Sequence, residues 1–136
     1  MDRDLEEYLK LIDFDSQYKK LIRKFKNKKI LLYGGGKLFR LINERYDLSK
    51  LNIIGICDKV FNIDEEGEEY NGYKKIPPEC VDKYNPDLVL TVTLEYYILI
   101  NKLRNTIFKD RNIDIRPIAY VPFWMFIKEA VFDNEG

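Results

Sequence analysis

Three consecutive glycines, Gly34, Gly35 and Gly36, directly follow a run of apolar residues, and this junction restricts the fold more than any other feature. The run at 30–33 has no charged position, as expected of a strand buried on both faces in a parallel sheet. From Leu38 onward apolar residues return at helical spacing. A buried strand that turns at once into a helix opens a β–α–β unit, which predicts an α/β domain.

Further apolar runs extend this pattern along the chain. Residues 53–57 and 88–92 predict buried strands, and residues 94–108 predict a helix. A short helix is expected to begin near Pro78, and a last strand within 113–120 is expected at a sheet edge because Pro117 lacks an N–H donor. The acidic stretch 59–72 predicts an exposed, mobile loop that ends in an Asn71-Gly72 turn.

The predicted fold class is therefore α/β: a Rossmann-like three-layer sandwich with a four- to five-stranded, mainly parallel sheet and an N-terminal helical extension. The extension is residues 1–28, read as two amphipathic helical pieces with Asp15 or Ser16 as the N-cap of the second. Residues 29–136 form the Rossmann-like domain, within the usual size of one domain. The apolar segment Phe123–Phe126 either packs on this domain or makes a homo-oligomer contact.

Composition excludes several classes of function. Lys+Arg and Asp+Glu balance at 23 each, so the chain lacks the overall field of a nucleic-acid binder. No apolar run approaches the roughly 20 residues of a membrane span. The polar N-terminus and two cysteines without metal-site spacing predict a cytoplasmic protein with reduced thiols. The chain has no histidine, the commonest general base, and we assign no catalytic residue, although other side chains or a cofactor could still support catalysis. The acidic stretch lacks the spaced ligands of a calcium loop, so we assign no metal.

The glycines have the arrangement of a phosphate-binding turn. Gly34 permits the sharp turn from strand to helix, and Gly36 lets backbone approach a pyrophosphate without a Cβ in the way. The following helix N-terminus presents N–H groups to an anion. Lys37 either adds charge to a bound phosphate or is an ordinary surface lysine. Phe39 stands where the pattern asks for Gly or Ala, which implies looser packing or a displaced helix.

An acidic residue and two threonines complete the candidate site. Asp58 lies 22 residues after Gly36 at the end of the second strand, where it is placed to bond a ribose hydroxyl. Thr91 and Thr93 follow the third strand and border the same crevice. As an alternative to phosphate binding, the glycines form a tight turn without a ligand and Asp58 is a loop residue. As an alternative to a binding role, Thr91 is a β-branched strand residue and Thr93 is the N-cap of the next helix.

Together, the runs KKILLYGGGKLFRLI, LNIIGICDKV and NGYKKIPPECVDKYNPDLVLTVT resemble the small Rossmann-like nucleotide-binding domains of bacterial surface-sugar metabolism. Such domains stand at the front of sugar acetyltransferases and are attached to capsule methyltransferases and glycosyltransferases. The resemblance covers roughly residues 28 to 108 and implies a nucleotide or nucleotide-sugar ligand at the glycines and Asp58. Because no acetyltransferase or methyltransferase half is recognised in these residues, we do not expect the catalytic activity of such larger enzymes to carry over.

Three functions remain open on this basis. The first is a nucleotide- or nucleotide-sugar-binding domain that acts with a partner enzyme and has no catalysis of its own. The second is a small NAD(P)-dependent oxidoreductase or sugar-nucleotide-modifying enzyme that is completed by dimerisation. The third is an interaction module without a ligand.

Overall fold

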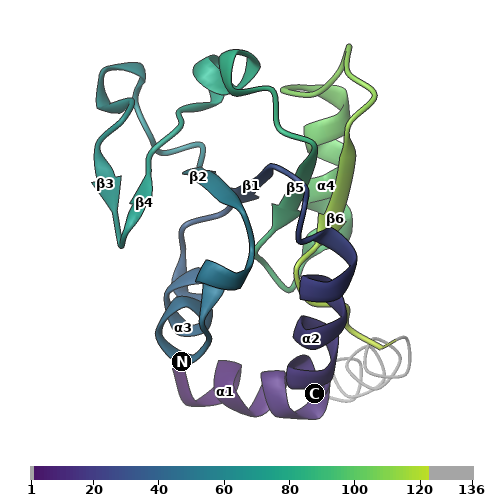
Figure 1. Ribbon diagram of the computed structural model, residues 1–136. Coiled ribbons are helices and arrows are strands. Elements are labelled where there is room, and N and C mark those ends of the chain that lie inside the picture. Colours follow the sequence, from purple (N-terminus) through teal and green to yellow (C-terminus); the bar gives the residue numbers. More distant parts are fainter. Residues whose placement is uncertain (1, 123–136) are drawn as a thin grey trace, which may run out of the picture.

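The computed structural model describes residues 2–122 of the chain (Figure 1). The helical elements are α1 (Asp2–Leu11), α2 (Phe14–Phe25), α3 (Lys37–Arg45), α4 (Tyr96–Asn105) and the short 3₁₀ helices η1 (Leu48–Lys50), η2 (Ile63–Glu65) and η3 (Pro78–Tyr84). The strands are β1 (Ile30–Tyr33), β2 (Ile53–Cys57), β3 (Glu69–Tyr70), β4 (Tyr73–Lys74), β5 (Leu88–Thr91) and β6 (Asp114–Pro117).

The main sheet has four parallel strands in the order β2-β1-β5-β6. From β1 the chain crosses to β2 on one side, and it later returns to β5 on the other side. The strand order therefore reverses at β1, which makes the end of β1 a topological switch point. These features confirm the predicted Rossmann-like α/β class. The edge position of β6 confirms the prediction from Pro117.

Alternate residues of the strands point to opposite faces, and both faces are covered, which explains the continuous apolar runs. One face packs against α1, α2 and α3 and carries the side chains of Ile30, Leu32, Ile56, Leu88 and Leu90. The other face packs against η3 and α4 and carries the side chains of Leu31, Tyr33, Cys57, Val89 and Ile115.

Side chains of the N-terminal helices α1 and α2 belong to the same hydrophobic core as those of one face of the sheet. Phe14 is fully buried, and its ring contacts those of Tyr18 and Tyr46 with centroids 5.8 and 4.9 Å apart. In Figure 1, α1 lies between the lower ends of α3 and α2. The N-cap of α2 is Asp13, so the expectation of Asp15 or Ser16 is wrong: the chain reverses earlier, with Asp13 in the left-handed region at φ 53°. The division of the chain at residue 28 stays a prediction.

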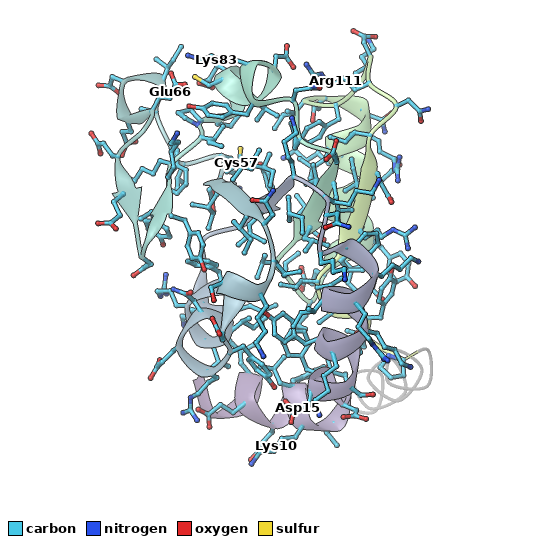
Figure 2. The ribbon with its side chains drawn as sticks, in the orientation of Figure 1. Lys10, Asp15, Cys57, Glu66, Lys83 and Arg111 are labelled. Atoms are coloured by element: carbon cyan, nitrogen blue, oxygen red, sulfur yellow. The ribbon has the colours of Figure 1, made fainter. Side chains whose placement is uncertain are left out.

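The acidic stretch 59–72 is more regular than the predicted loop. It contains η2 and the strand β3, which pairs with β4 in an antiparallel hairpin. Asn71 and Gly72 form its two-residue turn with φ of 49° and 93°, the left-handed pair that such hairpins favour. Glu66 accepts from Lys83 and from Tyr84, both at 2.7 Å, which ties the segment to η3 (Figure 2). Glu65 and Glu68 pair with Lys75, and Glu66 pairs with Lys83, so these three carboxylates have neighbouring partners.

Two elements differ in extent from their predictions. The helix expected over 94–108 is shorter, as α4, and the short helix near Pro78 is of the 3₁₀ type. Among residues 2–122 we find no helix with both the length and the apolar character needed to cross a membrane. The segment Phe123–Phe126, predicted either to pack on the domain or to make a homo-oligomer contact, lies outside the described residues.

We expect Phe14→Ala to lower the free energy of unfolding by about 3–5 kcal/mol, because the substitution leaves a cavity in the shared core. Urea denaturation followed by circular dichroism measures this change, with Ile98→Ala as the control at a side chain that is 76% exposed. A variant that loses only a minor helical signal, while the sheet domain unfolds at its original midpoint, would contradict the shared core.

Candidate functional site

The glycine turn lies at the carboxyl end of β1, between the ends of β2 and β5. Gly34 donates its N–H to Cys57 O at 2.9 Å and has φ 114°, a conformation that disfavours any side chain. A Cβ atom at Gly34 would lie 3.1 Å from the backbone oxygen of Val92. Backbone conformation and close approach to the chain after β5 both explain glycine at this position.

Gly35 is held by the candidate acidic residue. Its N–H donates to Asp58 Oδ2 at 2.8 Å, and Asp58 Oδ1 accepts from the Val60 N–H at 3.2 Å. The Tyr70 hydroxyl donates to Gly35 O, and a Cβ on Gly35 would lie 3.0 Å from the Tyr70 ring. The structure therefore brings Asp58 to the turn, as the spacing predicted, but the carboxylate already serves two backbone N–H groups.

Gly36 and Lys37 begin α3 and face solvent. Gly36 is the N-cap with φ −85°, and its Cβ position has open space, with no heavy atom within 4 Å. Within residues 2–122, the N–H groups of Gly36, Lys37 and Leu38 have no hydrogen-bond partner. Three backbone donors and one lysine are thus available at the positive end of a nine-residue helix. This is the part of the turn that can receive an anion.

Phe39 has a structural role in this turn. It is only 1% exposed, and its ring contacts those of Tyr70 and Tyr73 at centroid distances of 5.9 and 6.0 Å. Phe61 also contacts Tyr70, at 5.3 Å. The aromatic side chain fixes the β3–β4 hairpin against the turn. Our sequence reasoning missed the contact between Tyr70 and Gly35; the only available signal was that tyrosines flank the Asn71-Gly72 turn on both sides.

The two threonines have local partners. Thr91 is fully buried, and its hydroxyl donates to Arg116 O at 3.5 Å, as expected of a residue inside a strand. Thr93 is partly exposed, and its hydroxyl accepts from the Glu95 N–H at 3.3 Å just before α4. Only Thr93 therefore has an exposed surface near the candidate site.

The buried thiol and phenol near the turn are not poised for proton transfer at neutral pH. Burial raises the pKa of Cys57 to about 12, and burial likewise raises the pKa of Tyr33 to about 12. Figure 2 shows Cys57 in the interior, below η3. In the described part of the chain, no three His, Cys, Asp or Glu side chains gather where they could hold a metal ion.

Four surface cavities lie away from the turn, with volumes of about 450, 310, 180 and 460 Å³. None of these four is lined by the glycines or by Asp58. The turn therefore offers its donors from the surface of the molecule and not from within one of these cavities.

No protein-family model matches the chain, and no curated protein matches it either. The resemblance to nucleotide-binding domains of surface-sugar metabolism stays a prediction.

We expect Asp58→Ala to lower the free energy of unfolding by about 1–3 kcal/mol, because it leaves the N–H of buried Gly35 without a partner. Asp58→Asn is the matched control, since its amide oxygen accepts the same hydrogen bond without the charge. Urea denaturation of both variants measures the difference. Equal stability of Asp58→Ala and the unmodified chain would contradict a stabilising role of this contact.

The raised pKa of Cys57 predicts a loss of stability at high pH. The unfolded thiol ionises near its ordinary pKa of 9.0, whereas the folded thiol keeps its proton up to about 12. The unfolded state therefore binds fewer protons above pH 9, and stability falls as the pH rises. Between pH 8 and 10 this group alone removes about 1.4 kcal/mol. The decline measured by urea denaturation should be smaller by this amount in Cys57→Ala, and an equal decline in both proteins would contradict the shift.

Proposed function

We propose that this chain is a nucleotide- or nucleotide-sugar-binding domain that acts with a partner enzyme in bacterial surface-sugar metabolism, without catalysis of its own. One observation carries the proposal. The unpaired N–H groups of Gly36, Lys37 and Leu38 and the open space at Gly36 lie at the switch point of the sheet. Open α/β sheets bind their ligands at such points, and helix N-termini bind phosphate.

Asp58 divides the site into two parts. Its carboxylate lies 2.8 Å from the Gly35 nitrogen and repels a second anion there, so a phosphate is directed toward Gly36, Lys37 and Leu38. The same carboxylate oxygens keep lone pairs that can accept hydrogen bonds from the hydroxyls of a ribose or hexose. A ligand with a phosphate joined to a sugar satisfies both parts, and both NAD(P) and nucleotide sugars have this chemistry.

The role of a partner enzyme rests on the family resemblance and on the chemistry of the chain. The sequence contains no histidine, and the thiol beside the turn, Cys57, has a raised pKa. Binding without turnover is therefore the simplest activity for the described residues, and a partner enzyme would supply the reaction.

A second candidate, an interaction module without a ligand, is favoured by one specific observation. Asp58 and Tyr70 satisfy both polar backbone groups of Gly35 from within the chain. A turn that is complete in this way needs no ligand for its conformation. The two functions differ in a direct binding experiment.

The experiment is a thermal-shift screen of the whole chain against NAD(H), NADP(H), ATP and UDP-, GDP- and CMP-sugars. A ligand present at a hundred times its Kd adds about 2.7 kcal/mol of stability, which raises the Tm of a domain of this size by roughly 9 °C. We expect a specific nucleotide or nucleotide sugar to reach this shift with no change in the ligand on prolonged incubation. Oxidation of NAD(P)H or conversion of the sugar would instead identify an enzyme.

Two pairs of variants locate the binding site. Gly36→Val fills the open space at the N-cap and should abolish the shift, whereas Gly36→Ala, which adds one methyl group, should reduce it less. Lys37→Ala should weaken binding, whereas Lys50→Ala, at another exposed lysine, should not. Each shift is measured from the variant's own Tm. A flat screen at millimolar ligand would favour the interaction module, and normal binding by Gly36→Val would place the ligand elsewhere.

A further inference from the structure

Two of the surface cavities meet at Tyr120, beside the edge strand β6. One, of about 310 Å³, lies along α4 and β6 and is lined by Ile100, Pro117 and Tyr120, among others. The other, of about 180 Å³, lies between α2 and β6, with Leu21, Phe25 and Ile118 among its lining residues. Pro117 and Tyr120 line both, and we call the two adjoining cavities together the Tyr120 groove. Its exposed side is largely apolar.

The side of this groove toward α2 is positively charged. Lys20, Lys24 and Arg116 line it together with the apolar residues. Arg116 pairs with Asp114 at 3.0 Å, but within residues 2–122 neither Lys20 nor Lys24 has a carboxylate partner. An occupant that fits this surface has apolar side chains for the floor and carboxylates for the two lysines.

The chain is fixed at the border of the groove. The Gln17 side chain donates to Tyr120 O at 3.0 Å and accepts from the Tyr120 N–H at 2.7 Å. The next residue, Val121, donates its N–H to the buried Tyr96 hydroxyl at 3.2 Å. The last 14 residues of the chain, 123–136, therefore begin three positions after Tyr120, which itself lines the groove.

These last residues have the composition that the groove requires. Apolar side chains dominate, namely Phe123, Trp124, Met125, Phe126, Ile127, Val131 and Phe132. Three carboxylates, those of Glu129, Asp133 and Glu135, follow the first apolar run. Burial of these large apolar side chains is favourable relative to their exposure to water. A covalently attached segment also meets its site at an effective concentration in the millimolar range.

We propose that the Tyr120 groove is the docking site for residues 123–136 of the same chain, with Lys20 and Lys24 facing the carboxylates of this segment. The docking is intramolecular and is independent of any ligand at the glycine turn. It assigns a role to Lys20 and Lys24, which line the groove and have no carboxylate partner among residues 2–122, and to the apolar C-terminal residues.

Trp124 is the only tryptophan of the chain and reports on this docking directly. In the full-length protein, we expect blue-shifted emission and severalfold weaker quenching by acrylamide than in the urea-unfolded chain. Lys20→Glu/Lys24→Glu should shift the emission to the red and raise the quenching constant. The matched control, Lys19→Glu/Lys28→Glu, changes two exposed lysines that do not line the groove and should leave both values unchanged.

A charge swap tests the pairing itself. Glu129→Lys/Asp133→Lys, introduced into the Lys20→Glu/Lys24→Glu chain, should restore the protection of Trp124. Light scattering after size exclusion, at several protein concentrations, separates docking within one chain from docking onto a second copy.

Protection in a monomer, lost on charge reversal and regained on the swap, supports the proposal. Quenching as strong as in the unfolded chain overturns it. Protection that disappears on dilution as a dimer dissociates overturns it in favour of a second copy. Protection that no groove variant changes also overturns it, because the segment then packs elsewhere.

Discussion

The hydrogen bond from the Gly35 N–H to the Asp58 carboxylate joins the end of β1 to the end of β2, and the local geometry of the site depends on it. Gly34, on one side, takes a left-handed conformation against the chain after β5. Gly36, on the other side, starts α3 with its N–H groups toward solvent. The three glycines thus have different physical tasks, and only the last is available to a ligand. The hydrogen bond to Asp58 holds Gly35 in place between these two glycines.

Much of the fold follows from features that are local in sequence. Strands buried on both faces need continuous apolar runs, so residues 30–33, 53–57 and 88–92 were recognisable without tertiary information. Pro117 indicated an edge strand because it removes a donor, and Asn71-Gly72 indicated a turn because both residues tolerate positive φ. Burial of a strand, the missing N–H of proline and a positive φ each depend on a few neighbouring residues, so each leaves a local sequence signal.

What could not be predicted depends on contacts between distant residues. The spacing of Asp58 from the glycines placed it near the turn, but its bond to Gly35 depends on how β2 ends beside β1. Tyr70 reaches Gly35 across 35 positions, and no local pattern encodes that contact. The extent of α4 and the early N-cap of α2 at Asp13 are likewise decided by packing and chain reversal rather than by helical periodicity.

At Phe39, the residue that the sequence motif asks for differs from the residue that the packing of this structure requires. A protein engineer who replaced Phe39 with glycine would complete the familiar dinucleotide-binding pattern on paper. In the molecule, the same change would take away the ring on which Tyr70 and Tyr73 rest and would loosen the hairpin that covers Gly35. Phe39 departs from the motif because its ring packs against Tyr70 and Tyr73 and so fixes the hairpin at the turn. Consensus repair at this position would damage the feature that it was meant to restore.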